Sequence, residues 1–309
     1  MHQPVLVKEV LNNLLTEDSE IIVDATVGSG GHAEVIATKL KKKDRLICID
    51  RDENALKIAK KHLALHKSKI EFAHLRFSQI GDFLLSLHIK EISGFLFDLG
   101  LCSLHLKEAE RGFSFQLDGP LDMRMDQSQS KNAFEVVNHY SLSELTRIFY
   151  KFGQERFSKK IARAMVNQRK KAPILTTFQL RGLVESVINP RYRIKSLARC
   201  FQAIRIEVND ELSELRQGLN QAIGFLTGGG RLCIISYHSL EHRLIRDKMR
   251  RESRGCNCPP DLPVCCCAAR ATLRMITKPI VPSPGEKERN PGARSAKLWV
   301  AEKLSSQSN

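Results

Sequence analysis

Short apolar runs alternate with amphipathic segments through the first hundred residues. Runs that predict buried strands lie at 21–25, 45–50, 70–74 and 94–99. Segments that predict helices lie between them, near 32–41, 53–66 and 79–88. Strands that alternate with helices form a mostly parallel sheet with helices on both faces. The pattern therefore predicts an α/β fold for this part of the chain.

The pattern changes in the middle of the chain. From about 104 to 200 no convincing apolar strand is present, and Phe157, Ile161 and Met165 recur at the spacing of a helix. Alternation then resumes, with a helix over about 210–226, a turn at 228–230, a strand at 231–236, a basic helix at 240–251 and strands at about 272–278 and 296–302. We therefore expect a sheet domain in two parts, 1–103 and 201–309, with an inserted helical domain at 104–200.

Positive charge is concentrated in the predicted insertion. The whole chain carries a formal net charge of +15, and residues 151–200 hold 13 Lys or Arg against two acids, a local charge of +11. Charge of one sign at this density repels itself, so a phosphate-rich partner explains it better than a solvated face does. We expect that partner to be nucleic acid, and we expect residues 104–200 to bind it.

Composition narrows the class of protein further. A hydrophobic content of 42% with 27% charged residues is typical of globular proteins, and no apolar run reaches the ~18 residues of a membrane span. The N-terminal residues lack the basic start and apolar core of a signal peptide. We therefore expect a cytoplasmic protein with no membrane partner, whose nine cysteines are reduced. The oligomeric state is left open.

A glycine-rich turn follows the first predicted strand. Asp24 ends that strand, Gly28-x-Gly30-x-x-Ala33 opens the next helix, and Asp50 ends the second strand. Glycine permits a tight turn and close approach of a ligand, and a carboxylate after the second strand suits the two hydroxyls of a ribose. Asp24 would repel a pyrophosphate but attract an ammonium group. The pattern thus favours S-adenosylmethionine over a dinucleotide, and Asp98 is expected at the same sheet edge.

Several longer motifs resemble those of the ribosomal RNA small subunit methyltransferase H family, also called MraW. The most specific are residues 110–115 (ERGFSF) and 118–125 (DGPLDMRM). Others include residues 24–32 (DATVGSGGH), 201–206 (FQAIRI), 236–241 (SYHSLE) and 290–295 (NPGARS). The resemblance covers nearly the whole chain. It implies a Rossmann-like, S-adenosylmethionine-dependent fold and N4-methylation of a cytidine in 16S rRNA of the small ribosomal subunit, near the P site.

The resemblance also implies a set of site residues. Carried over by position, the cofactor contacts are Gly30, Gly31, His32, Asp50, Phe77, Asp98 and His105. His105 departs from the family pattern, which usually has Gln there. From charge and helical spacing, we expect Arg156, Lys160 and Arg163 to line one helical face and to contact RNA phosphates.

The catalytic group is harder to assign. The cytosine amine is a poor nucleophile, so an acceptor for its N–H would assist the reaction most. Residues 98–103 (DLGLCS) lack the Asn/Asp-Pro-Pro-aromatic motif of many amino-methyltransferases. Asp98 is our first candidate for the acceptor, and the loop at 118–125 is the second source.

Cysteines suggest two rival interpretations. A Cys102 thiolate would support C5-methylation of a pyrimidine, although a small buried residue is the interpretation we favour. A weak zinc site could be formed by Cys256, Cys258, Cys265 and Cys267, but the spacing is not the usual Cys-x-x-Cys pair, and we expect no metal. His238 and His242 lack the Glu of a His-Glu-x-x-His motif, so we expect a substrate-facing or capping pair. The alternative outside the enzymes is an RNA-binding protein that has the same Rossmann-like sheet but no catalytic activity.

Overall fold

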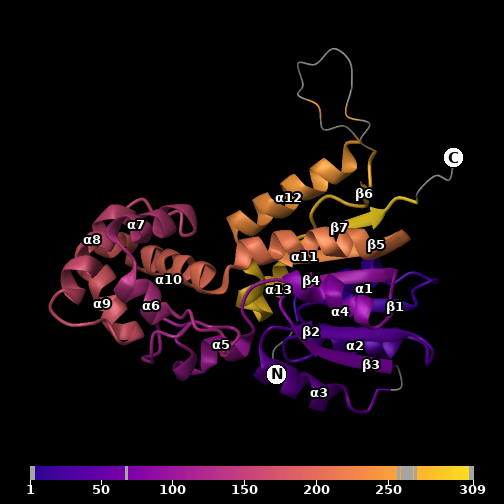
Figure 1. Ribbon diagram of the computed structural model, residues 1–309, viewed down its shortest axis with the longest axis horizontal. Coiled ribbons are helices and arrows are strands. Elements are labelled where there is room, and N and C mark those ends of the chain that lie inside the picture. The colour runs from indigo at the N-terminus through magenta and orange to yellow at the C-terminus, as the bar shows by residue number, and fades with distance from the viewer. Residues whose placement is uncertain (1–3, 67–68, 256–257, 259–266, 268–269, 306–309) are drawn as a thin grey trace. The chain divides into compact units, whose positions relative to one another are not determined.

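The computed structural model describes residues 4–66, 69–255, 258, 267 and 270–305, and the chain divides into two compact units (Figure 1). Unit 1 comprises Met1–Gly100 and Leu212–Asn309, and unit 2 comprises Leu101–Glu211. The boundary that we expected at residue 200 falls inside helix α10 (Arg193–Asn209), all of which belongs to unit 2. The second boundary therefore lies later in the chain than the sequence pattern suggested.

Unit 1 is built on a seven-stranded sheet in the order β3-β2-β1-β4-β5-β7-β6. Its strands are β1 (Ile21–Asp24), β2 (Arg45–Asp50), β3 (Lys69–His74), β4 (Ile92–Asp98), β5 (Leu226–Ser236), β6 (Leu273–Met275) and β7 (Lys297–Lys303). Strands β1 to β5 pair in parallel, and β7 runs antiparallel to β5 and to β6. The mostly parallel α/β sheet expected from the sequence is confirmed.

Helices cover both faces of this sheet. Successive strand residues point to opposite faces, so Ile47 of β2 packs in one core while Leu46 packs in the other. One core includes side chains of α4 (Ile80–Ser86), α11 (Glu211–Phe225) and α12 (Ser239–Ser253). The other includes side chains of α1 (Val7–Leu14), α2 (Gly31–Lys39) and α3 (Glu53–Leu63). Short elements complete the unit: η1 (Phe77–Gln79), α13 (Pro284–Arg289) and η4 (Pro291–Ser295).

One helix of unit 1 was missed, and two local expectations need correction. Helix α1 was not anticipated, although its apolar residues Val7, Val10, Leu11 and Leu14 recur at helical spacing. The glycines at 228–230 lie within the bounds of β5 rather than in a turn between two elements. Leu226 pairs with Ile92 and Arg231 with Gly94, so residues 227–230 stand opposite a single residue of β4 and form a bulge. Strand β6 is also shorter than the apolar run at 272–278.

Unit 2 is helical, as expected. It contains α5 (Ser103–Lys107), η2 (Ala109–Arg111), α6 (Ala133–His139), α7 (Leu142–Lys151), α8 (Ser158–Arg169), α9 (Thr177–Val187), η3 (Pro190–Tyr192) and α10. Among its described residues the one β-type pairing is an isolated bridge between Pro120 and Thr176. Ile161 and Met165 of α8 are buried in its core, in line with the apolar spacing. Within the described ranges, no helix of either unit has the length and apolar character needed to cross a membrane.

Candidate active site

Three aspartates end neighbouring strands at the carboxyl edge of the sheet. Asp24 ends β1, Asp50 ends β2 and Asp98 ends β4. Strand β1 pairs with both of the others, and the order of strands along the chain reverses there. Ligands of open parallel sheets bind beyond this edge at such a reversal. The convergence of the three acids expected from the sequence is therefore confirmed.

Asp24 has a buried carboxyl group, and one of its two oxygens has no hydrogen-bond partner among the described residues. It is 1% exposed, and burial raises its pKa to about 7, with the charges of Asp98 and Asp50 adding to the rise and those of His32 opposing it. Its Oδ1 accepts the N–H of Thr26 at 3.0 Å, whereas its Oδ2 has no hydrogen-bond partner among the described residues. Such an oxygen is suited to an incoming cation, which would offset the cost of burying the charge.

Asp50 joins its strand to the glycine turn. Its Oδ2 accepts the N–H of Gly28 at 2.7 Å, and its Oδ1 accepts the N–H of Asp52 at 2.9 Å. These two bonds join the end of β2 to the glycine turn and to the start of α3. The arrangement suits the ribose-binding role predicted for Asp50.

Gly30 is required by the turn, which is one of the two reasons that the sequence argument gave. Its φ is +96°, a conformation that residues with a side chain rarely adopt. A Cβ there would lie 3.4 Å from the Cα of Ala59 in α3, an ordinary contact, so the backbone conformation is what requires glycine. Gly30 is the N-cap of α2 and offers no side chain to its first N–H groups, which leaves them available to a ligand.

Asp98 has a neighbour on each carboxylate oxygen. The hydroxyl of Tyr237 donates to Oδ1 at 2.7 Å, and Nε2 of His32 lies 3.4 Å from Oδ2. Burial alone would lower the pKa of His32, but the nearby Asp98 carboxylate raises it by more. The N–H of Asp98 donates to Oγ1 of Thr26 at 2.5 Å, which ties β4 to the turn after β1. Tyr237 received no role from the sequence, although it lies in the motif at 236–241.

Phe77 is held beside the same edge by helix α11. Ser78 donates to the buried Glu214 from its N–H at 2.9 Å and from its hydroxyl at 3.1 Å, and Gln221 donates to the carbonyl of Ser78 at 2.7 Å. A Cβ on Gly218 would come within 2.8 Å of the Cβ of Phe77, so only glycine fits there. The half-buried ring of Phe77 packs edge-on against the ring of Phe97, with the two ring centroids 5.2 Å apart.

His105 belongs to unit 2. It lies in α5, is 5% exposed, and stacks on Phe113 with ring centroids 4.8 Å apart. Its N–H donates to the carbonyl of Cys102 at 3.0 Å. Its contact with the cofactor stays a prediction from the family resemblance.

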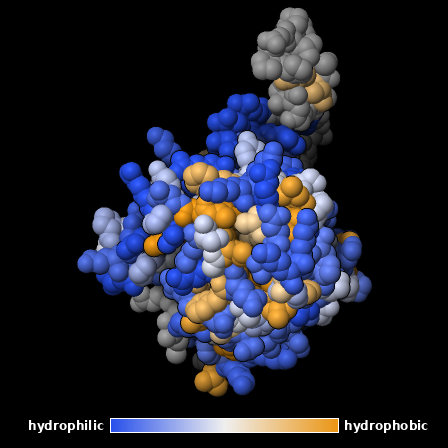
Figure 2. Space-filling view, turned by 90° about the vertical axis from the view of Figure 1, so that its left-hand side faces the viewer, coloured by the Kyte–Doolittle hydropathy of each residue, from blue (hydrophilic) through white to orange (hydrophobic). Residues whose placement is uncertain are grey.

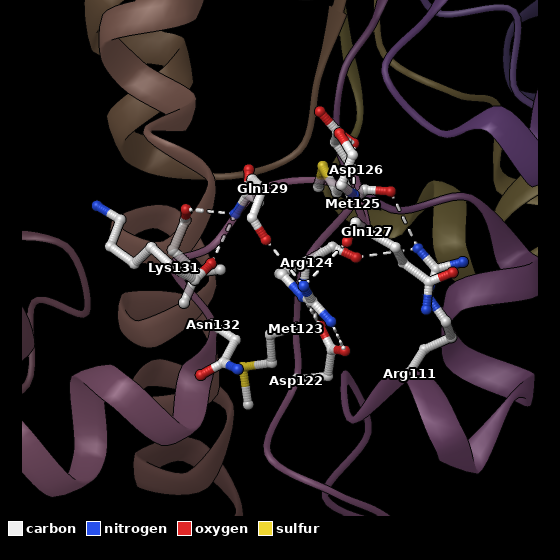
Figure 3. A network of polar contacts seen from close by, with 12 residues as sticks. Arg111, Asp122, Met123, Arg124, Met125, Asp126, Gln127, Gln129, Lys131 and Asn132 are labelled. Atoms are coloured by element: carbon white, nitrogen blue, oxygen red, sulfur yellow. Dashed lines mark hydrogen bonds and ion pairs between the residues drawn. The ribbon is translucent and has the colours of Figure 1, made fainter.

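The loop at 118–125 has its acids engaged in unit 2 (Figure 3). Asp122 holds Arg124 with two hydrogen bonds of 2.8 Å, one on each carboxylate oxygen. The same guanidinium donates to the carbonyls of Gln127 and Gln129, and Arg111 donates to the carbonyls of Arg124 and Met125. Asp118 accepts the N–H of Phe178. These bonds give the loop a structural role and make Asp122 a weaker candidate acceptor than Asp98.

Part of the basic segment is used inside unit 2. The side chains of Arg169 and Arg193 donate to backbone carbonyls, Arg181 pairs with Glu185, and Arg199 lies 3.6 Å from the buried Glu155. The cations of α8 and its C-terminal end are different, because all are exposed and α8 contains no acid: Lys159, Lys160, Arg163, Lys170 and Lys171. Figure 2 shows that hydrophilic side chains cover most of the face in view, with smaller hydrophobic patches among them.

Arg156 does not share a helical face with Lys160 and Arg163. It precedes α8, and its guanidinium lies 4.6 Å from the ring centre of Phe157 and 4.1 Å from that of Tyr192. The guanidinium lies over both rings, and Arg156 as a whole is exposed. Lys160 and Arg163 do lie on the exposed face of α8, three residues apart. The expected single stripe is therefore corrected to two cations on the helix and one stacked beside it.

The remaining cysteine and histidine predictions have mixed outcomes. Cys256 and Cys265 lie outside the described residues, so the zinc alternative stays a prediction, and Cys258 and Cys267 are half-buried. His238 is the N-cap of α12, so the capping alternative is confirmed for this residue, whereas His242 contacts the carbonyl of Ser236 at the end of β5. A substrate-facing role of the pair stays a prediction. Cys102 is half-buried at the start of unit 2.

Known proteins resemble this chain over its whole length. A family model described as the MraW methylase family matches residues 1–304. The chain is 45% identical over 305 residues to "Ribosomal RNA small subunit methyltransferase H" of Caldicellulosiruptor saccharolyticus, which covers 98% of this chain and 99% of that protein. It is 46% identical over 308 residues to the protein of the same name from Carboxydothermus hydrogenoformans, with 98% of each chain covered.

A solved rRNA methylase from Streptococcus thermophilus is also similar, with 12% identity, a TM-score of 0.44 and coverage of 98% of this chain and 99% of that one. The match to the family model over nearly the whole chain, together with relatives at this level of identity, is decisive. The chain therefore belongs to the MraW methylase family, a family of S-adenosylmethionine-dependent methyltransferases.

Proposed function

We propose that this protein methylates the exocyclic N4 of a cytidine in 16S rRNA of the small ribosomal subunit, near the P site, in the cytoplasm. Two lines of support lead to the proposal. Relatives at 45% and 46% identity are named as methyltransferases of small-subunit ribosomal RNA. The observation that carries the chemistry is the Asp98 carboxylate, held at the carboxyl edge of the sheet by a 2.7 Å hydrogen bond.

The residues of unit 1 fit S-adenosylmethionine. The Oδ2 of Asp24, unpartnered among the described residues, would meet the ammonium of the methionine part, and Asp50 would accept from the ribose hydroxyls. Phe77 would contact the adenine, and the start of α2, formed by the N-cap Gly30 and by Gly31 and His32, would face the ligand. When bound, the cofactor supplies an electrophilic methyl group on a sulfonium. Asp98 and, from unit 2, His105 complete the proposed cofactor set.

Asp98 is the proposed catalytic residue. The lone pair of the cytosine N4 is delocalised into the ring, so the amine gains nucleophilicity when an acceptor draws on its N–H. Asp98 lies at the sheet edge and is 19% exposed, so its carboxylate can receive that N–H. It would hold the amine in line for transfer and would take up the proton that the product loses.

The rRNA is proposed to bind unit 2 through its phosphates. Lys160 and Arg163 are exposed on α8, and the stacked guanidinium of Arg156 presents fixed donors beside them. Lys160 also lies in the first turn of α8, where a cation opposes the helix dipole, and that turn contains no acid. An anionic partner would relieve this repulsion.

Labelled S-adenosylmethionine and isolated small subunits that lack the modification provide the test. Nucleoside analysis of the 16S rRNA should show N4-methylcytidine, and Asp98→Asn should abolish it. A C5-methylated pyrimidine would instead favour the Cys102 mechanism. Calorimetry with S-adenosylmethionine distinguishes the N4- and C5-methyltransferase alternatives from a non-catalytic RNA-binding protein, because only the two enzymes would bind the cofactor.

A further inference from the structure

The hydroxyl of Tyr237 reaches Asp98 from the strand next to β4. Tyr237 follows the end of β5, which pairs with β4 in parallel, and its Oη lies 2.7 Å from Oδ1 of Asp98. The half-buried ring packs against Gly100, whose φ is +103°, and a Cβ on that residue would lie 3.1 Å from Cδ2 of the tyrosine. Gly100 therefore provides the space that the ring occupies.

The backbone that carries Tyr237 is held in place. The N–H groups of Tyr237 and His238 both donate to Oε2 of Glu241, at 2.8 Å and 3.2 Å. Glu241 is buried in the first turn of α12, where its charge favours the helix N-terminus. One residue earlier, the hydroxyl of Ser236 accepts from the indole N–H of Trp299 at 2.9 Å. The phenol thus stands on a segment fixed from both sides.

The contact with Asp98 has a definite direction. The pKa of Tyr237 is raised well above its ordinary value of 10, mainly by burial and then by the charge of Asp98. The phenol therefore stays protonated and can only donate to the carboxylate. Among the described residues of unit 1, the titratable groups near the Asp98–Tyr237 pair include His32 at Oδ2 of Asp98, the strand-end acids Asp24 and Asp50, and also Glu241 and Glu286.

We propose that Tyr237 is a positioning residue for Asp98. The inference rests on the proposed function, in which Asp98 accepts the amine N–H. Because the phenol holds Oδ1, the carboxylate cannot rotate freely, and Oδ2, which Nε2 of His32 approaches to 3.4 Å, is directed to the substrate amine. A short hydrogen bond to an ionised group is stronger than a neutral one, so it can fix the plane of the acceptor. Preorganisation of this kind acts on turnover rather than on affinity.

Tyr237→Phe removes only the hydroxyl and tests the proposal. We expect kcat on small-subunit rRNA to fall by about 10-fold to 100-fold, the range for a hydrogen bond to a charged group. The KM for rRNA and the affinity for S-adenosylmethionine should each change by less than about 3-fold.

Tyr140→Phe is the matched control. The hydroxyl of Tyr140 donates to Oε1 of Glu207 at 2.8 Å in unit 2, so the same atom is removed from the same kind of bond. This variant should keep the wild-type kcat at saturating rRNA, and melting temperatures of both variants report any general loss of stability. An unchanged kcat in Tyr237→Phe would overturn the proposal. So would a loss of cofactor affinity as large as the loss of kcat, which would indicate a structural role.

Asp98→Asn separates this inference from the function it rests on. If Asp98→Asn retains wild-type turnover, the proposed role of Asp98 is wrong and the role of Tyr237 falls with it. If Asp98→Asn is strongly impaired while Tyr237→Phe is not, only the positioning role fails. In the Asp98→Asn background we expect Tyr237→Phe to add little further loss, because the two residues act as one unit.

Discussion

The carboxyl edge of the sheet in unit 1 and the basic surface of α8 in unit 2 hold their charges in opposite ways. At the edge, Asp24 is 1% exposed and the Asp98 carboxylate has a phenol 2.7 Å away on one oxygen. On α8, Lys160 and Arg163 extend into solvent, and the helix itself carries no acid. The sheet edge fixes a few charges at a high desolvation free energy, and the surface of α8 presents many charges that stay solvated.

This difference separates two kinds of recognition. A buried charge is poorly screened and needs a specific partner, so it can position a cofactor or an amine, and replacing one residue has a large effect. Exposed cations are screened by salt and each adds a small share, so they suit a polyphosphate whose sequence they do not distinguish. The predictions below contrast single buried residues with grouped exposed ones.

Asp98→Asn should have the largest effect. The amide keeps the size of the side chain but loses the charge that accepts the amine N–H, and an acceptor of this kind contributes about 10²–10⁴-fold. We expect turnover to fall by at least about 100-fold, with little dependence on salt. Single-turnover methylation of small subunits at two salt concentrations measures this. A loss that disappears at low salt would assign Asp98 to RNA binding instead.

Asp24→Asn should weaken cofactor binding while stabilising the fold. Loss of the charge facing the ammonium should lower affinity for S-adenosylmethionine by about 10-fold to 100-fold. In the cofactor-free protein, the folded-state pKa of about 7 lies above the ordinary 3.8, so ionisation costs nothing at pH 3 and its cost grows until pH 7. Asp24→Asn avoids that cost and should be more stable than wild type at pH 8, by up to about 4 kcal/mol.

Calorimetry and denaturant unfolding at two pH values check both parts of this prediction. The stability advantage of Asp24→Asn should be mostly lost by pH 4, because at that pH the wild-type carboxyl is protonated in the folded state and only about half ionised in the unfolded state, where its pKa is 3.8. Wild-type affinity for the cofactor should also fall below about pH 7, as the carboxyl loses its charge. An advantage that persisted unchanged at pH 4 would mean that the buried charge is not its source.

The contributions of the exposed cations to RNA affinity should be additive and should depend on the salt concentration. Replacing Lys160 and Arg163 together by Gln should lower RNA affinity and flatten the slope of log K against log salt by about 1.4–1.8. Lys42→Gln with Lys90→Gln is the control, since both lysines are exposed and precede β2 and β4 at the opposite edge of the sheet. If both pairs changed the slope equally, the α8 surface would have no special role.

Arg156→Gln extends that series with a distinct outcome. Its guanidinium stacks on Phe157 and Tyr192, so its removal also loses ring contacts worth roughly 0.5–1 kcal/mol at an exposed site. We expect a further drop in RNA affinity and a small loss of thermal stability. Arg156→Lys keeps the charge but loses the planar guanidinium. Compared with Arg156→Gln, it should therefore recover more of the salt dependence of RNA binding than of the thermal stability.

Cys102→Ser should have the smallest effect. A serine keeps the size and loses the thiolate, and N4 transfer requires no thiolate, so methylation should stay within about 3-fold of wild type. Mass spectrometry of the rRNA product reports both the amount and the position of the methyl group. Loss of product with intact cofactor binding would restore the C5 mechanism.

The sequence predicted those parts of the site that lie within one strand and its following turn. An apolar run that ends in an acid places Asp24, Asp50 and Asp98 at one edge, because parallel strands end on the same side. The contact between Tyr237 and Asp98 joins residues 139 positions apart and depends on β4 and β5 being neighbours. No local pattern contains that information.

Charge counting was similarly incomplete in unit 2. The excess of cations was visible, but four arginines of the segment are used in internal bonds, and only the folded structure separates them from the exposed lysines. Helical spacing placed Lys160 and Arg163 correctly and Arg156 wrongly, because α8 begins two residues after Arg156. The glycines at 228–230 gave a turn signal, and the structure has there a bulge of β5 between Leu226 and Arg231, which both pair with β4.

Mass spectrometry of 16S rRNA nucleosides from cells that lack this protein tests the central claim most directly. The account predicts that one N4-methylated cytidine near the P site loses its N4 methyl group. The N4 methyl group returns when the wild-type protein is expressed in these cells. It stays absent when the Asp98→Asn variant is expressed at the same level. An unchanged nucleoside profile in the deletion strain, or full restoration by Asp98→Asn, would contradict the account.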